Sequence, residues 1–483
     1  MLFNSLDFAV FLPSVFFLYW FVFNKNLKHQ NLLIVVSSYY FYGLWDWRFL
    51  FLIFFSTLVD YSIGKSLLNV TNQKKRKGLL LISVFVNLGL LVFFKYYNFF
   101  LDNFIATFKF FGHPIDIQGL NIILPVGISF YTFQTMSYTI DVYRKKIEPT
   151  DNFITFCAFV SFFPQLVAGP IERASHLLPQ FTKKRTLEYD KAVDGMKQIL
   201  WGLFKKMVIA DNCALFANQI FDNSSELNGS TLLLGAVFFA FQIYGDFSGY
   251  SDIAIGVARL FGFDLMRNFA FPYFSRDVAE FWRRWHISLS TWFRDYLYIP
   301  LGGSRGSNWM KIRNIFIIFL VSGFWHGANW TFLVWGALNA FYFLPLLLSK
   351  KNRTNIDIIA QGKFLPSFKD FLAMVFTFFI TTIAWVFFRA NTIQHAGSYV
   401  SGIFSSSLFD IPHFKEINKG FTVILLLLFF IFIEWCGRES QFAIENIGVR
   451  WPRIIRWSFY SFLIFCIGMF MATYETPFIY FQF

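Results

Sequence analysis

The stretch that decides the fold is the longest apolar run of the chain, residues 315–348, which reads IFIIFLVSGFWHGANWTFLVWGALNAFYFLPLLL. As one straight helix it would be about 50 Å long, whereas the apolar core of a bilayer is about 30 Å thick. Basic residues flank both ends, Lys311 and Arg313 before the run and Lys350 and Lys351 after it. Two broken half-helices that enter and leave on the same, cytoplasmic side would explain both the length and the flanking charges. The run therefore predicts a membrane protein whose helices break inside the bilayer.

The composition supports the membrane class and excludes others. Of the 483 residues, 56% are hydrophobic, 15% are charged and 72 are Phe, whereas soluble proteins are about 25% charged. This hydrophobic content excludes a soluble globule and a disordered chain. The net charge of +13 lies in short clusters between apolar runs, which is typical of cytoplasmic loops and argues against nucleic-acid binding. The four Cys share no close spacing, so we expect no metal and no redox site.

Further apolar runs recur along the chain and predict an all-α bundle of about 10–12 spans in one domain, residues 1–483. The first run is expected to be a retained span, because it lacks the basic start and cleavage site of a signal peptide. No internal repeat is visible, which argues against inverted-repeat transporters. The other runs are Phe8–Phe23, Leu32–Trp45, Phe49–Ile63, Leu79–Phe94, Ile122–Ile140, Phe153–Val167, Leu232–Phe247, Phe371–Phe388, Phe421–Trp435 and Trp457–Met471.

Charge placement predicts the orientation. An even number of runs separates successive basic clusters, so all of them can face the cytoplasm, which places both termini outside. Residues 181–313 differ, because they mix charges with Trp at helical spacing. Trp and Arg together mark the headgroup level of a membrane. We therefore predict interfacial helices within residues 181–313, among them one helix over Phe281–Ile299.

His326 is the first candidate catalytic residue, near the middle of the long run. An ionisable residue inside a membrane run is a functional-site hypothesis by default. Gly323 and Gly327 permit a helix break or a close helix approach beside it. Ser322 or Asn329 could support an oxyanion through a hydrogen bond. The alternative is a core histidine bonded to a backbone carbonyl.

His286 is the second candidate, in the block WRRWHIS at residues 282–288. It could take part in catalysis, or it could anchor an interfacial helix at the headgroups. The sequence has no HExxH and no P-loop, and no His is followed five residues later by Asp. Its one GxSxG match, GGSRG at residues 302–306, follows no predicted strand and therefore lacks the strand–turn–helix setting of a nucleophile elbow. These absences argue against a serine hydrolase, a metallopeptidase and an ATP-driven pump.

Together these blocks resemble the membrane-bound O-acyltransferase (MBOAT) family, in the bacterial branch that contains alginate O-acetyltransferases and teichoic-acid D-alanyltransferases. The resemblance covers most of the chain. It rests on ordered blocks, which are MLFNS at 1–5, SYYFY at 38–42, LPVGISF at 124–130, DVYR at 141–144, FPQ at 163–165, GPI at 169–171, YGDFSGYSD at 244–252, FWRRWH at 281–286, RDY at 294–296, WHG at 325–327 and WVFFRA at 385–390.

The resemblance implies acyl transfer from a thioester to a hydroxyl in the bacterial inner membrane, within a polytopic helical bundle around a central His-containing tunnel. His326 matches the catalytic histidine of the family, and His286 matches its second histidine. The donor side would be cytoplasmic, and an extracytoplasmic SGNH-type acetyltransferase partner would often receive the group. The acceptor would be a polysaccharide, either an alginate-like exopolysaccharide or a cell-wall glycan.

The resemblance also leads to a hypothesis for the donor. The donor would be acetyl-CoA or an acyl-carrier thioester, and we expect no permanently bound cofactor. Its phosphates would bind Arg283, Arg284 and Arg294, beside Asp295, although these arginines could instead bind the headgroups of membrane lipids. His326 would take the proton of the attacking hydroxyl.

Three alternatives stay open from the sequence. They are a non-enzymatic transporter or flippase of a glycan or lipid, a scaffold that only recruits the extracytoplasmic partner, and peptidoglycan or teichoic-acid acyl transfer within the same family.

Overall fold

The computed structural model describes residues 1–167, 169–472 and 478–479. Every regular element in these residues is helical, which confirms the predicted all-α class. The chain forms two compact units: unit 1 is Met1–Lys191 with Ala258–Leu265, and unit 2 is Ala192–Val257 with Met266–Phe483. The single domain over residues 1–483 stays a prediction. The last residues of the chain, which we predict to be extracytoplasmic, lie outside the described ranges.

Seven helical stretches in the described ranges are long and apolar enough to cross a membrane, which makes the chain a multi-pass membrane protein. A shorter apolar helix, Leu6–Val22, precedes them, at the position of the predicted first span. The seven stretches are Leu27–Asn69, Gln73–Phe110, Gly229–Leu260, Trp330–Leu348, Phe368–Arg389, Ile417–Cys436 and Arg453–Phe470.

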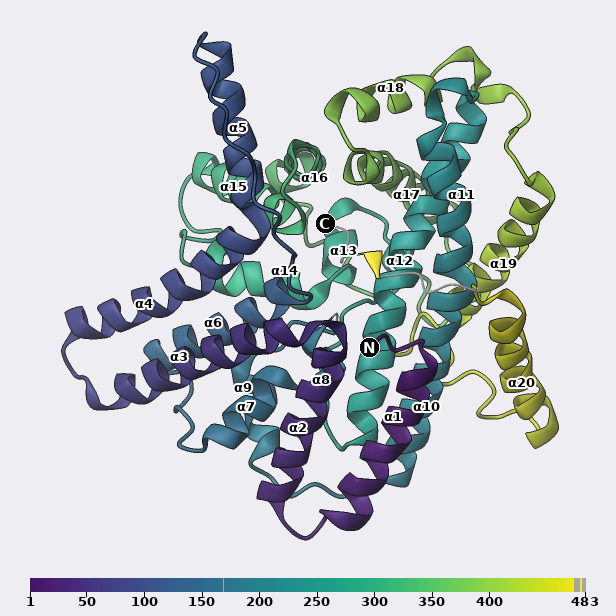
Figure 1. Cartoon of the computed structure of the whole chain (residues 1–483). Coiled ribbons are helices and arrows are strands. Elements are labelled where there is room, and N and C mark those ends of the chain that lie inside the picture. The colour runs from purple at the N-terminus through teal and green to yellow at the C-terminus, as the bar shows by residue number, and fades with distance from the viewer. Residues whose placement is uncertain (168, 473–477, 480–483) are drawn as a thin grey trace. The chain divides into compact units, whose positions relative to one another are not determined.

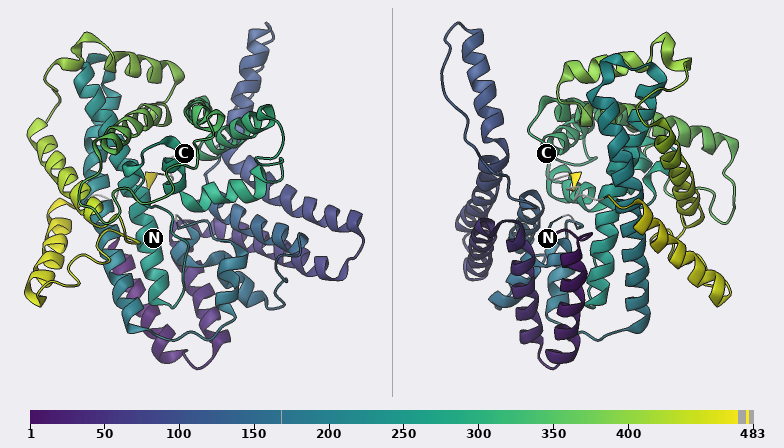
Figure 2. Two further views of the ribbon diagram at one scale, coloured as in Figure 1. Left: turned by 180° about the vertical axis from the view of Figure 1, so that it is seen from behind. Right: turned by 45° about the vertical axis from the view of Figure 1, so that its right-hand side comes forward.

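Unit 1 consists of the N-terminal helices (Figure 1). None of the residues of α5 is buried, and this helix extends beyond the others of its unit in both views of Figure 2. The helices are α1 (Leu6–Phe17), α2 (Leu27–Asp46), α3 (Leu50–Asn69), α4 (Gln73–Leu91), α5 (Tyr97–Phe110), α6 (Ile128–Tyr143), α7 (Phe153–Ser161), α8 (Phe163–Leu166) and α9 (Ala174–Leu177).

A buried polar cluster joins α3, α4 and α6 inside unit 1. The Asp60 carboxylate is fully buried and accepts hydrogen bonds from Ser83 Oγ at 2.5 Å, Asn87 Nδ2 at 2.8 Å and Thr139 Oγ1 at 3.1 Å. A buried carboxylate is tolerated only when its oxygens are satisfied in this way. The cluster therefore ties the three helices together at one level.

Unit 2 contains the long run that decides the fold. Its helices are α10 (Tyr189–Leu203), which begins in unit 1, then α11 (Asp211–Asp222), α12 (Gly229–Leu260), which ends in unit 1, α13 (Val278–Arg284), α14 (Ile287–Phe293), α15 (Asn308–His326), α16 (Trp330–Leu348), α17 (Phe368–Arg389), α18 (Ile393–Ile403), α19 (Ile417–Cys436) and α20 (Arg453–Phe470). A π-helical segment, Phe204–Ala210, joins α10 to α11.

The long run breaks where the sequence predicts. α15 ends at His326, Gly327 has extended backbone angles, and the Asn329 side chain caps α16 by accepting a hydrogen bond from the Thr331 N–H at 3.0 Å. α15 and α16 then pack side by side (Figure 1). Each has 19 residues, so each is longer than the half-helix that we expected.

The predicted continuous helix over Phe281–Ile299 is wrong. The chain forms α13 and α14 as two seven-residue helices, with a π-helical turn from Arg294 to Tyr298 after them. The break lies at His286, whose φ of 43° is in the left-handed region that a non-glycine residue rarely adopts. Asn268 holds the break, because its backbone carbonyl accepts from the Ile287 N–H at 2.9 Å.

Candidate active site

Both candidate histidines line one cavity of about 470 Å³ in unit 2. The centroids of the His286 and His326 rings lie 6.5 Å apart, and the two residues are 1% and 3% exposed. The walls come from α13, α14, α15 and the C-terminal part of α16. The break after α15 and the break between α13 and α14 thus bring together two histidines that are 40 positions apart in the sequence.

Aromatic side chains orient the His326 ring at the end of α15. Trp335 meets it edge-on with ring centroids 5.2 Å apart, and Phe388 of α17 does so at 5.3 Å. Ser322 lies one turn earlier on α15 and lines the same cavity, as the sequence hypothesis requires. The ring is therefore held by packing at the buried end of the cavity.

Asn268 orients the second histidine, and the sequence analysis missed it. Its Oδ1 accepts from the Ser288 N–H at 3.3 Å and from Ser288 Oγ at 2.9 Å, which identifies this atom as the oxygen of the amide. The same Oδ1 lies 3.1 Å from His286 Nδ1, so Nδ1 carries the proton. Burial lowers the pKa of His286 to about 3, so the ring is neutral at physiological pH.

The other end of the cavity is basic. Arg294, Lys311, Lys350 and Arg353 all line it, and three of them are exposed, while Lys311 is half-buried. Along α15, the 15 positions from Lys311 to His326 correspond to about 22 Å. The cavity therefore combines an exposed cationic end with a buried imidazole end, a geometry suited to an elongated anionic ligand. Lys311, Lys350 and Arg353 could not be assigned from the sequence, because loops far apart in the chain bring them together.

Several other predicted residues lie elsewhere. Asp295 pairs with Arg294 at 2.8 Å. Asn329 caps α16 and donates from Nδ2 to the Asn391 carbonyl at 3.0 Å, so both of its polar atoms have structural partners. Arg283 and Arg284 do not line the histidine cavity, and their guanidinium groups bind the loop after α16 and the Glu280 carboxylate.

A buried ionic network in unit 2 is a further feature that the sequence analysis missed. It joins α10, the π-helical segment, α11, α12 and α19. The contacts are Lys205 with Asp252 at 2.5 Å, Lys206 with Asp211 at 2.8 Å and with Asp246 at 2.7 Å, and Glu434 with the Tyr244 hydroxyl at 2.5 Å and Trp201 Nε1 at 3.0 Å. Buried charges in a membrane protein are paired in this way because an isolated charge is costly there.

Comparison with known proteins assigns the family. The membrane-bound O-acyltransferase family profile matches residues 34–383. The chain is 37% identical to a probable alginate O-acetylase AlgI of Pseudomonas putida, over the full length of both chains. It is 33% identical to a peptidoglycan O-acetyltransferase of Helicobacter pylori, over 100% of this chain and 98% of the relative. A teichoic acid D-alanyltransferase of Bacillus subtilis is 28% identical over 57% of this chain and 71% of its own length.

Proposed function

The chain belongs to the membrane-bound O-acyltransferase family, and on that premise we propose that it transfers an acetyl group from a cytoplasmic thioester to hydroxyl groups of an extracytoplasmic polysaccharide. Family membership makes it an O-acyltransferase, which decides against the transporter and the scaffold. The relatives named for alginate and for peptidoglycan support two acceptor classes, an alginate-like exopolysaccharide and a cell-wall glycan.

The observation that carries this proposal is that the cavity has a cationic, exposed end and a buried end with two histidines. In acetyl-CoA and in an acylated carrier protein, a long pantetheine arm separates the thioester from the phosphate. A ligand of this shape matches a cavity with His326 and His286 at its buried end and Arg294, Lys311, Lys350 and Arg353 at its exposed end. Guanidinium and ammonium groups bind phosphate oxygens through charge-assisted hydrogen bonds.

His326 acts as the general base in this proposal. The acceptor hydroxyl attacks the thioester carbonyl carbon and gives its proton to the imidazole, a C–O bond forms and the C–S bond breaks. The thiolate leaves and takes up the proton that the imidazole accepted, which returns His326 to its neutral form. General-base assistance accounts for about 10²–10⁴ in rate. Ser322 would donate a hydrogen bond to the developing oxyanion, and its place on the cavity wall, one turn from His326, supports this role.

The acceptor side follows from the predicted orientation. The protein lies in the bacterial inner membrane with both termini outside, and the donor enters from the cytoplasm. The acetyl group reaches the polysaccharide directly or through an SGNH-type partner protein outside the membrane.

The test compares two histidine variants in membranes that carry the chain. Labelled acetyl-CoA is supplied, and acetyl esters on the extracted polysaccharide are counted. His326→Ala should lower transfer at least 100-fold, since general-base assistance is lost. His113→Ala is the matched control, because His113 is exposed in a loop of unit 1. Equal transfer by His326→Ala and His113→Ala, at equal amounts of folded protein, would refute the role of His326.

A further inference from the structure

The loop between α16 and α17, residues 349–367, forms part of the cavity wall. It contributes Lys350, Asn352 and Arg353 to the lining, which includes two of the four cations at the exposed end. A fixed backbone lets these side chains bind a ligand without the entropic cost of ordering the loop. The contacts of the loop backbone therefore bear on ligand binding.

Two arginines of the block WRRWHIS, residues 282–288, hold this backbone. Arg283 donates from Nη1 to the Asn352 carbonyl and from Nη2 to the Asn355 carbonyl, both at 2.8 Å. Arg284 donates from Nη2 to the Asp357 carbonyl at 3.0 Å. One guanidinium thus spans two carbonyls of the segment that carries Arg353, a contact that the fixed fork of arginine can make and lysine cannot.

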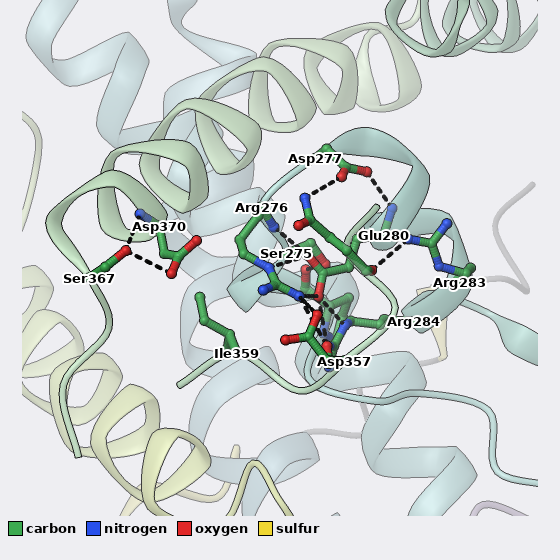
Figure 3. Close-up of polar contacts among 12 residues, drawn as sticks. Ser275, Arg276, Asp277, Glu280, Arg283, Arg284, Asp357, Ile359, Ser367 and Asp370 are labelled. Atoms are coloured by element: carbon green, nitrogen blue, oxygen red, sulfur yellow. Dashed lines mark hydrogen bonds and ion pairs between the residues drawn. The ribbon is translucent and has the colours of Figure 1, made fainter. Parts of the chain in front are cut away.

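Glu280 binds two arginines that contact the loop, Arg276 and Arg284 (Figure 3). Its carboxylate is 1% exposed and accepts from Arg284 Nη2 at 2.7 Å and from Arg276 Nε at 3.0 Å. Arg276 also donates to the Asp357 carbonyl at 3.0 Å, beside Arg284. A buried carboxylate between two guanidiniums restrains both of them, because each charge satisfies the others.

The residue that caps the start of α13 also contacts the loop. Asp277 caps α13 by accepting from the Glu280 N–H at 2.7 Å, and its second oxygen accepts from Asn355 Nδ2 at 2.6 Å. The loop is therefore bonded at Asn352, Asn355 and Asp357, that is, on both sides of Arg353 and two residues after Lys350.

We propose that Arg283 and Arg284 are positioning residues that act through the loop of residues 349–367 to place Lys350 and Arg353 against the phosphates of the acyl donor. This inference rests on the proposed function and replaces direct phosphate binding by the two arginines. It explains why both arginines lie outside the histidine cavity.

The experiment uses two donors with the full-length chain in membranes or nanodiscs. Acetyl-CoA carries the phosphates, and S-acetylpantetheine carries the same thioester without them. Arg283→Ala should raise KM for acetyl-CoA roughly tenfold, the effect of a weakened charge-assisted contact. Its kcat should stay within about twofold, and both constants for S-acetylpantetheine should be unchanged. Arg450→Ala, an exposed arginine of the same unit, is the control.

A double-mutant cycle tests whether the effect travels through the loop. Arg353→Gln removes one cation that Arg283 is proposed to position. In this background Arg283→Ala should change KM less than in the wild type, because the two residues serve one contact. Additive effects of the two substitutions would overturn the proposal, and so would an equal loss with both donors.

A measurement independent of activity covers a variant that folds poorly. Hydrogen exchange of the backbone amides in residues 352–363 should rise in Arg283→Ala and should not rise in Arg450→Ala. Unchanged exchange in Arg283→Ala would overturn the proposal. Wild-type membranes that transfer acetyl groups from neither of these thioesters nor from an acetylated carrier protein would overturn the proposed function itself, a result that no Arg283 variant can produce.

Discussion

Gly323 offers a direct test of the contact between α15 and α16. A Cβ at this position would lie 2.2 Å from the carbonyl oxygen of Phe332, and one at Gly336 would lie 2.3 Å from the carbonyl oxygen of Phe319. The two helices therefore touch through their backbones at both glycines. The substitution Gly323→Ala adds one methyl group at the tightest point, three residues before His326.

The expected magnitude follows from that distance. Ordinary contacts begin near 3.4 Å, so the added Cβ must move the helices apart by about 1 Å. Overpacking of this kind costs about 1–3 kcal/mol, and the better helix propensity of Ala offsets about 1 kcal/mol. The variant should therefore fold. A displacement of about 1 Å at a catalytic group lowers rates about 100-fold, so we expect acetyl transfer to fall by about that factor.

The assay measures acetyl transfer from labelled donor in membranes, per amount of folded protein found by fluorescence-detected size exclusion. The matched control is Gly468→Ala in α20, where a Cβ would meet nothing within 4 Å. Transfer by Gly323→Ala within threefold of Gly468→Ala would show that the contact between α15 and α16 does not set the position of His326.

Three further predictions concern residues around the site. Asn268→Ala removes the acceptor of the His286 Nδ1–H, so kcat should fall roughly tenfold with little change in KM for the donor; a wild-type kcat contradicts this role. Glu434→Ala leaves the Tyr244 hydroxyl and the Trp201 N–H without their acceptor and should cost about 1–3 kcal/mol, seen as a lower Tm in detergent than for Glu434→Gln. Burial lowers the pKa of His286 to about 3, so its ring takes up a proton only near or below pH 3. The variant His286→Gln should therefore keep the wild-type pH dependence of kcat between pH 5 and 9. If the variant lost one limb of that pH profile, the result would contradict a neutral His286 ring.

The sequence was sufficient for the break of the long run and for one catalytic candidate. A 34-residue apolar run is too long for one crossing, and Gly327 and Asn329 are poor continuations of a helix but good ends and caps. His326 stood out because an ionisable side chain is rare in such a run. These inferences rest on local properties, which a single sequence displays.

The direction of the side chains in residues 281–299 could not be predicted in the same way. Periodicity favours a continuous helix there, and nothing local reveals that Asn268 holds His286 in a left-handed conformation. Likewise, Arg294 and Arg283 look equivalent in the sequence. Only the loop after α16 distinguishes them, because it binds Arg283 and leaves Arg294 on the cavity wall.

The ionic network around Glu434 has a consequence for biosynthesis. Glu434 is the partner of Trp201, 233 residues earlier in the chain. At roughly 5–20 residues per second, a ribosome needs about 12–47 seconds to bridge that interval. During this time α12 is made and α10 is already complete, while the carboxylate that completes the network is still missing. We therefore expect the nascent chain to stay in contact with the insertion machinery until α19 emerges, and a chain truncated before α19 to be degraded.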